Sequence, residues 1–156
     1  MKEKDIIAKI KVYTYTELNE TDKILVEKAI KVALNAYAPY SKFYVGAAVK
    51  LSNGEIVTGN NQENAAFPSG TCAERSAIYY AHANYPDATV DAIAIAAHHN
   101  GDYVETPISP CGACRQAILE YETLAKKPIR VLLCGRSEVY QIDGIATLLP
   151  LCFSEF

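Results

Sequence analysis

The stretch Asp91-Ala92-Ile93-Ala94-Ile95-Ala96-Ala97 decides the fold class, because it is apolar without alternation. A run of this kind predicts a strand that is buried on both faces of a sheet. Residues 129–134 form a second such run, and helices are predicted from Cys72 to about His82 and from Cys111 to about Leu124. Helices that alternate with buried strands predict a layered α/β fold with a mixed sheet.

The chain before this region predicts one helix and one hairpin. N-cap chemistry at 19–22 precedes helically spaced apolar residues that run to Ala36, and Pro39 is expected to end the helix. Residues 44–51 and 56–59 are strand-like on either side of a polar turn, which predicts a β-hairpin.

The two ends of the chain carry weaker patterns. Residues 139–142 predict a short strand, and 145–149 a final helical turn or two before Pro150. Residues 9–15 alternate loosely and predict an extra strand or an arm. We therefore divide the chain into an N-terminal extension, residues 1–20, and a single domain, residues 21–156.

Composition excludes several function classes. The 156 residues are 50% hydrophobic and carry a net charge of −3, so a large basic face for a nucleic-acid polymer is not expected. No apolar run approaches the ~20 residues that span a bilayer, so no membrane partner is expected. The charged N-terminus lacks the apolar stretch of a secretory signal, which makes a cytoplasmic location the default.

Three of the five cysteines form a candidate metal centre. Cys111 and Cys114 make a Cys-x-x-Cys pair at a predicted helix start, where two sulfurs can lie about 2.3 Å from one zinc ion. Cys72 offers a third sulfur from the start of another helix, whereas Cys134 falls in a predicted core strand and Cys152 in the tail. Three protein ligands with an open fourth position indicate a catalytic zinc site.

The charge of three thiolates has to be compensated, because together with a divalent ion they leave a net charge of −1. The helix N-termini carry partial positive charge, and Arg75 and Arg115 are close enough in sequence to donate to the thiolates. Glu74 follows Cys72 by two residues, so its carboxylate can accept a proton from an activated water and return it to a substrate.

Other readings of the cysteines stay open at this point. A lone Cys-x-x-Cys is more often structural zinc or a redox pair, and a non-catalytic zinc protein or a thiol redox protein is the alternative of another class. Glu74 and the missing fourth ligand argue against a non-catalytic zinc protein, and Cys72 argues against a thiol redox protein. His82, His98 and His99 are not expected to be ligands.

The motifs resemble those of a known family, the small three-cysteine cytidine deaminases. The resemblance starts from Cys72-Ala73-Glu74-Arg75 and Pro110-Cys111-Gly112-Ala113-Cys114-Arg115-Gln116. Residues 38–48, 61–67 and 148–153 resemble further segments of the family in the same order, so that the likeness covers roughly residues 22–153.

The resemblance implies a fold, an activity and an assembly. It implies a three-layer α/β/α architecture with a five-stranded mixed sheet, and a homotetramer with active sites at subunit interfaces. It implies one zinc ion per subunit and a small nucleoside as substrate. The activity would be hydrolytic deamination of cytidine and 2′-deoxycytidine to uridine and 2′-deoxyuridine in pyrimidine salvage, with ammonia released and Glu74 carrying the protons.

Motif by motif, the resemblance also implies substrate contacts. Asn61 and Glu63 would bind the ribose hydroxyls, and Phe43 would stack near the pyrimidine. The backbone around Ala73 would read the edge of the base together with Glu74. Phe153 would close an active site, which in the family belongs to a neighbouring subunit. Without the resemblance, Asn61 and Glu63 are interpreted as loop residues, and Phe43 and Phe153 as core aromatics.

Two more residues are implied to support the metal site, and two positions depart from the family's pattern. Arg75 and Gln116 would tune the cysteines from behind the metal. The chain departs from the family's pattern at Phe67, where tyrosine is usual, and at Leu151, where a small residue is common. A deaminase of an aminopyrimidine nucleoside antibiotic such as blasticidin S is the nearest alternative, and a polynucleotide editor is a weaker one.

Overall fold

A mixed β-sheet forms the middle layer of the computed structural model, which describes residues 1–154. Within that range the sheet has seven strands in the order β1-β7-β6-β4-β2-β3, with β5 paired to β4. The pairing of β4 with β6 is parallel, and all the other pairings are antiparallel. The strands are β1 (Lys11–Thr14), β2 (Phe43–Leu51), β3 (Ile56–Asn60), β4 (Val90–His99), β5 (Asp102–Tyr103), β6 (Arg130–Cys134) and β7 (Glu138–Asp143).

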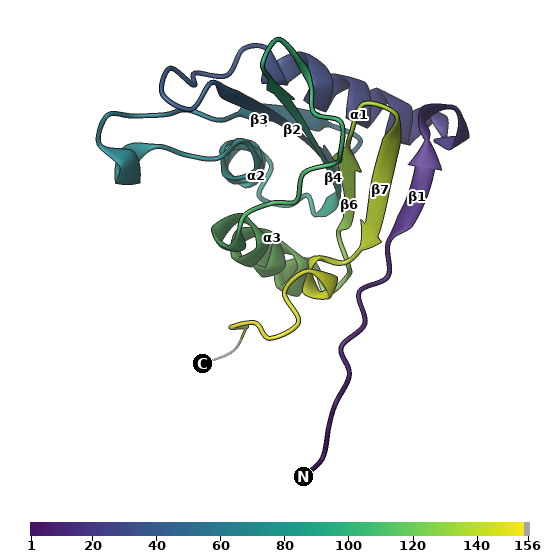
Figure 1. Cartoon of the computed structure of the whole chain (residues 1–156). Helices are drawn as coiled ribbons and strands as arrows, with labels where there is room; N and C mark the ends of the chain where they lie inside the picture. The colour runs from purple at the N-terminus through teal and green to yellow at the C-terminus, as the bar shows by residue number, and fades with distance from the viewer. Residues whose placement is uncertain (155–156) are drawn as a thin grey trace.

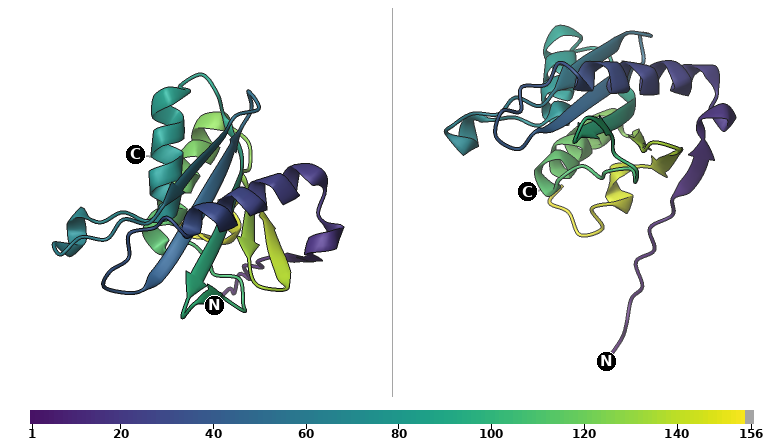
Figure 2. Two further views of the ribbon diagram at one scale, coloured as in Figure 1. Left: turned by 90° about the horizontal axis from the view of Figure 1, so that it is seen from above. Right: turned by 45° about the horizontal axis from the view of Figure 1, so that its top comes forward.

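Helices cover both faces of the sheet. The helix α1 (Glu20–Ala33) lies on one face, and α2 (Ala73–Asn84) and α3 (Gly112–Ala125) lie on the other (Figures 1 and 2). Three short 3-10 helices complete the fold, namely η1 (Tyr15–Glu17), η2 (Phe67–Ser69) and η3 (Ile145–Thr147). The α/β class and the three layers are therefore confirmed.

The central strand β4 is buried on both faces, as its unbroken apolar sequence predicts. Ile93 and Ile95 pack into the core beneath α2 and α3. Ala92, Ala94 and Ala96 face the core beneath α1. Small side chains on the α1 side allow the helix to approach closely, and a Cβ at Gly46 in the neighbouring β2 would collide with the backbone of α1. The sheet thus presents a different packing surface to each helical layer.

The sheet has two more strands than the five expected. One is β1, from the stretch predicted to be an extra strand or an arm, and it pairs with the edge strand β7. The other is the two-residue β5, which forms because Asn100 and Gly101 adopt positive φ and turn the chain back on β4. The sequence of neither strand has an apolar pattern strong enough to predict which strand it pairs with.

The first helix ends earlier than predicted. α1 stops at Ala33, before Ala36 and well before Pro39. The N–H of Tyr37 donates instead to the carbonyl of Asn61, which joins the chain after α1 to the loop after β3. A long-range pairing therefore ends the helix before the proline can do so.

The N-terminal segment belongs partly to the core. β1 is held by its ladder with β7 and by an ion pair between Lys11 and Asp143. Leu18 is buried against the α1 side of the sheet. Residues 1–10 are exposed and run away from the body of the molecule (Figures 1 and 2).

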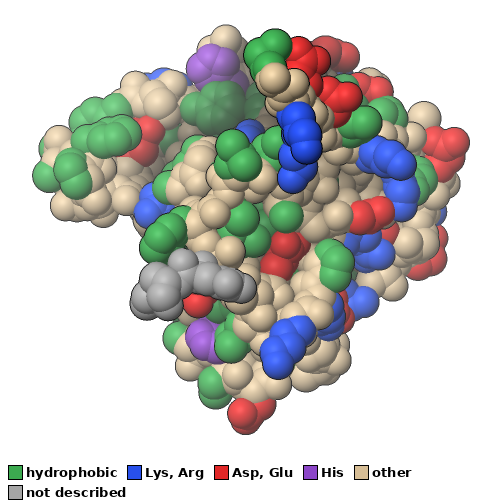
Figure 3. Space-filling view, turned by 90° about the horizontal axis from the view of Figure 1, so that it is seen from below, with side chains coloured by type: hydrophobic (Ala, Val, Ile, Leu, Met, Phe, Trp, Pro, Cys, Tyr) green, Lys and Arg blue, Asp and Glu red, His purple; other side chains and the backbone are tan. Residues whose placement is uncertain are grey.

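Surface charges are mixed in sign. On the face shown in Figure 3, Lys and Arg side chains are interspersed with Asp and Glu. This distribution agrees with the net charge of −3. Among residues 1–154, no helix has the length and apolarity that crossing a membrane requires.

Candidate metal centre and active site

Two helix starts bring three thiols together. Cys72 is the N-cap of α2 and Cys111 is the N-cap of α3, and neither side chain caps its own helix by a hydrogen bond. Cys114 lies in the first turn of α3 and is fully buried. The three sulfur atoms all lie within 4.8 Å of one another, and those of Cys72 and Cys111 are 3.9 Å apart.

This arrangement fits a zinc ion. A tetrahedral zinc with Zn–S distances of about 2.3 Å places its sulfur ligands about 3.8 Å apart, close to the separation of Cys72 and Cys111. Among the described residues, no histidine, carboxylate or further cysteine joins the cluster. The donor set therefore leaves one tetrahedral position for water or substrate, as in catalytic zinc sites.

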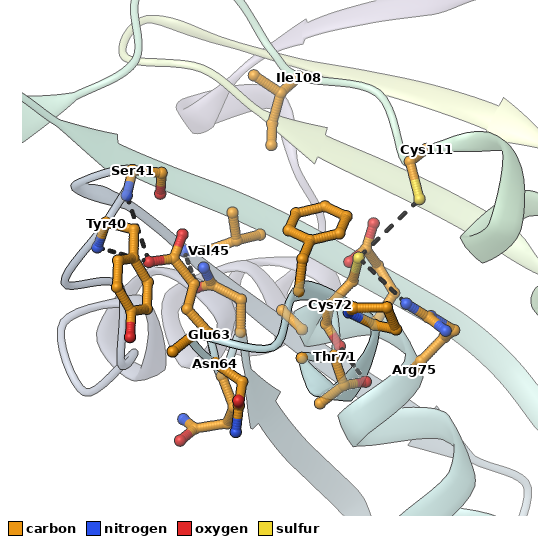
Figure 4. A pocket seen from close by; sticks show the side chains of 18 of the residues that line it. Tyr40, Ser41, Val45, Glu63, Asn64, Thr71, Cys72, Arg75, Ile108 and Cys111 are labelled. Atoms are coloured by element: carbon orange, nitrogen blue, oxygen red, sulfur yellow. Dashed lines mark hydrogen bonds between the residues drawn. The ribbon is translucent and has the colours of Figure 1, made fainter.

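Arg75 supplies positive charge to the thiols. From the first turn of α2, its Nη2 donates to the sulfur of Cys72 at 3.6 Å (Figure 4). Hydrogen bonds from Cys114 and from Arg75 lower the pKa of Cys72 to about 5. Donation to Cys72, together with burial, raises the pKa of Cys114. The local field therefore favours a thiolate at Cys72.

Arg115 does not supply such charge, and the expectation that it donates to the thiolates is wrong. Its Nε donates to the carbonyl of Pro110, Nη1 to that of Leu148 and Nη2 to the hydroxyl of Ser109. The side chain turns away from the sulfurs, because oxygen acceptors in the preceding loop and the C-terminal segment surround it.

Glu74 lies beside the cluster with its side chain almost out of water. It is the second residue of α2 and is only 5% exposed. Burial raises the pKa of its carboxyl group. A carboxyl group in this position is suited to take up and release a proton next to a metal-activated water.

A cavity of about 770 Å³ opens beside the thiols and Glu74. Its walls come from the loop after α1, the loop between β3 and α2, the start of α2 and the loop before α3 (Figure 4). The candidate site residues on these walls are Asn61, Glu63, Cys72, Ala73, Glu74, Arg75 and Cys111. Residues more than thirty positions apart in the sequence thus share one concave surface of a size typical for small ligands.

The two polar residues of the loop after β3 are held by backbone. The amide of Asn61 accepts from the N–H of Val45 at 2.7 Å and donates to the carbonyl of Phe43 at 3.0 Å. The Glu63 carboxylate accepts from the N–H groups of Tyr40 and Ser41, and hydrogen bonds from Ser41 lower its pKa. Each side chain is fixed at the cavity wall and retains hydrogen-bonding capacity for a ligand.

Three predicted residues lie off the wall of this cavity in the described chain. Phe43 stacks at a tilt against His99, with ring centroids 5.5 Å apart. Phe153 is 66% exposed, and its carbonyl accepts a hydrogen bond from Gln116 at 2.7 Å. Gln116 therefore contacts the C-terminal segment. The proposed contacts of Phe43 and Phe153 with substrate stay predictions.

Several lining residues escaped the sequence analysis. Tyr40 and Ser41 join the site because their backbone N–H groups bind Glu63, and Ile108 and Ser109 because they precede Cys111. None of them carries a periodic or chemical signal of its own. Proximity in sequence to a recognised motif is the one signal that could have found Ile108 and Ser109.

The fold and the site together define a class, the zinc-dependent enzymes that use a buried carboxyl group beside a three-thiolate metal. The sequence profile of the cytidine and deoxycytidylate deaminase zinc-binding region matches residues 19–127, and the chain belongs to this family. The resemblance inferred from the motifs is confirmed. Zinc is accordingly the metal of the Cys72, Cys111 and Cys114 cluster.

Similar proteins extend the likeness over most of the chain. A cytidine deaminase of Halalkalibacterium halodurans is 36% identical over 132 residues, which cover 85% of this chain and 93% of the relative. One of Sporosarcina psychrophila is 37% identical over 136 residues, or 87% and 93%. The crystal structure of cytidine deaminase from Burkholderia pseudomallei has a TM-score of 0.71 at 35% identity and covers 87% of this chain and 100% of its own.

Proposed function

We propose that this chain is a zinc-dependent hydrolase that converts cytidine and 2′-deoxycytidine to uridine and 2′-deoxyuridine with release of ammonia. One observation carries the proposal. The buried carboxyl of Glu74 and two of the three clustered thiols, those of Cys72 and Cys111, line the same cavity as the two polar residues Asn61 and Glu63, which suit a sugar. The activity named for the relatives supports the choice of substrate.

The chemistry requires one acid–base group and one activated water. A zinc ion held by Cys72, Cys111 and Cys114 would supply a Lewis acid that makes a water molecule acidic enough to attack at neutral pH. Glu74 accepts the proton of that water and passes it to the ring nitrogen beside C4. The hydroxyl adds to C4, Glu74 then takes the proton of this new hydroxyl group and delivers it to the amino group, and the C4–N bond breaks to release ammonia and leave the C4 carbonyl.

Substrate orientation follows from the cavity walls. Asn61 and Glu63 lie on the wall formed by the loop between β3 and α2, and Cys72 and Glu74 lie at the start of α2. A nucleoside that places its base against the metal can therefore direct its ribose hydroxyls to the amide and the carboxylate. The backbone at Ala73, the first residue of α2, lies on the same wall and is available to the edge of the base.

We further propose that the protein works as a cytoplasmic homotetramer in pyrimidine salvage, with active sites completed at subunit interfaces. The support is apolar surface near the site. Phe67 lines the cavity and is nevertheless 90% exposed, and Leu151 and Phe153 are exposed on the C-terminal segment. Exposed apolar side chains of this kind would be covered in an assembly of several copies of the chain.

The test is the ultraviolet absorbance of nucleosides incubated with zinc-loaded protein. Loss of the amino group changes the spectrum of cytidine, so we expect conversion of cytidine and 2′-deoxycytidine. A cytosine-containing oligonucleotide and blasticidin S serve as comparison substrates and should stay unchanged. Conversion of either comparison substrate without conversion of the nucleosides would overturn the assignment. Sedimentation of the same sample tests the tetramer.

A further inference from the structure

One of the three thiols is held less firmly by its surroundings than the others. Cys114 is buried within the first turn of α3 and Cys72 is half-buried, but Cys111 is exposed. Cys111 ends a segment, residues 104–111, that forms neither helix nor strand. The position of its sulfur therefore depends on the contacts that fix this loop.

The loop is attached at both ends by arginines. At its far end, the backbone N–H of Arg136 donates to the carbonyl of Glu105, and the Arg136 guanidinium forms ion pairs with Asp102 and Glu105. At the end next to the metal centre, the guanidinium of Arg115 folds back from the first turn of α3. It donates to the carbonyl of Pro110 and to the hydroxyl of Ser109, each at 2.9 Å.

The same guanidinium also holds the C-terminal segment. Its Nη1 donates to the carbonyl of Leu148 at 2.7 Å. The next residue, Gln116, donates to the carbonyl of Phe153 at 2.7 Å. Two consecutive side chains of α3 therefore grip the segment 148–153 at its beginning and near its end, beside the helix turn that carries two of the thiols.

We propose that Arg115 is a positioning residue that couples retention of the metal to the placement of the C-terminal segment. One planar, permanently charged group satisfies acceptors on both structures at once. When the group is removed, Pro110 and Ser109 lose their common donor and Cys111 moves more freely. Leu148 loses the same donor, so the segment 148–153 loosens together with the metal ligand. This inference rests on the proposed function for the identity of the metal site.

The test compares substitutions at the two arginines of the loop in the zinc-loaded protein. Arg115→Met removes every donor and keeps the apolar stem. Arg115→Lys keeps the charge but lacks the planar group that donates to three acceptors at once. Arg136→Met is the matched control, because it loosens the same loop at its far end. The first measurement is the rate at which zinc passes to a colorimetric chelator. We expect release about tenfold faster in Arg115→Met, about threefold faster in Arg115→Lys and unchanged in Arg136→Met.

The second measurement is hydrogen exchange of backbone amides. In Arg115→Met, exchange should accelerate at Ser109 and Cys111 and at the non-proline residues of 149–153, whereas in Arg136→Met it should accelerate in neither segment. Zinc release within twofold of the native rate in both Arg115 variants would overturn the proposal. Faster zinc release in Arg115→Met without faster amide exchange in residues 149–153 would also overturn it. Zinc release accelerated equally by Arg136→Met would do the same. If Arg115→Met does not fold, Arg115→Lys decides by the same criteria. Neither readout uses a nucleoside, so failure of the proposed deaminase activity would be recognised separately.

Discussion

The guanidinium of Arg75 lies with its Nη2 3.6 Å from the sulfur of Cys72, one helical turn further along α2. Three thiolates around a divalent ion leave a negative charge, which opposes acidification of a bound water. A cation in hydrogen-bonding contact with one of the sulfurs reduces that charge. Among the described arginines near the cluster, Arg75 makes this contact and Arg115 does not.

Replacing Arg75 by glutamine should therefore reduce turnover without removing the metal. We expect kcat to fall by about 10–100-fold, the usual cost of losing a group that supports a metal ligand. Zinc content should stay near one ion per chain, because no ligand is removed. Steady-state kinetics and elemental analysis of the same preparation measure both quantities. Unchanged kcat would show that the charge of Arg75 is not needed.

Replacing Glu74 by glutamine should remove the proton carrier and preserve the shape of the cavity. Loss of a general acid–base group typically costs about 10²–10⁴-fold in rate, and we expect a fall of kcat in that range. Single-turnover absorbance changes with zinc-loaded protein provide the measurement. Near-normal turnover in a variant that retains zinc would exclude Glu74 from the chemistry.

Two cysteine substitutions should differ in their effect on zinc content. Cys111→Ala removes a sulfur of the cluster, so stoichiometric zinc should be lost and thermal stability should fall with it. Cys134→Ala changes a cysteine of β6 that is buried in the core and far from water. That variant should keep its zinc and lose about 1 kcal/mol of unfolding free energy. Zinc retained in Cys111→Ala would contradict the ligand assignment.

Alkylation should separate the two cysteines that lie outside the cluster. Burial raises the pKa of Cys134 to about 12, so at pH 8 its thiol stays protonated as well as inaccessible. Cys152 is exposed on the C-terminal segment. Brief treatment of the zinc-loaded protein with iodoacetamide should modify Cys152 and spare Cys134, as read by peptide mass spectrometry. Modification of Cys134 in the native protein would contradict its placement in the core.

Glu122 should matter for stability and not for chemistry. One oxygen of its carboxylate accepts from the backbone N–H groups of Ile129 and Ile145, at 2.8 and 2.6 Å, which joins the end of α3 to the starts of β6 and η3. Glu122→Ala leaves both buried N–H groups without an acceptor and should cost about 2–4 kcal/mol, measured by urea unfolding at fixed protein concentration. Glu120→Ala, at an exposed position of the same helix, is the control and should change little.

The buried strands and the thiol cluster were predictable for a clear physical reason. The unbroken apolar run of β4 admits few placements other than the middle of a covered sheet, and β6 repeats the pattern. Thiols at two helix starts have few chemical uses apart from a metal. Each signal lies within a short stretch of sequence, although the structure is what brings Cys72 to Cys111 across 39 positions.

What escaped prediction depends on contacts between distant segments. The three acceptors of Arg115 include Leu148, and no local pattern indicates that the C-terminal segment returns to the start of α3. The resemblance implies a ribose contact for Asn61, and no local pattern indicates that its side chain joins the loop to the backbone of β2. The early end of α1 has the same origin, because Tyr37 pairs with that loop. Long side chains and loop pairings are decided by tertiary structure.

The two N-cap positions have a consequence for the robustness of the molecule. Serine, threonine or aspartate at an N-cap typically stabilises a helix by about 1 kcal/mol, because the side chain accepts a backbone hydrogen bond. At Cys72 and Cys111 the side chains make no such bond and face the metal cluster instead. Both helices therefore begin at the same spot without a conventional cap. Catalysis and helix stability make opposite demands on these two positions, so selection for a sturdier apoprotein would erode the enzyme.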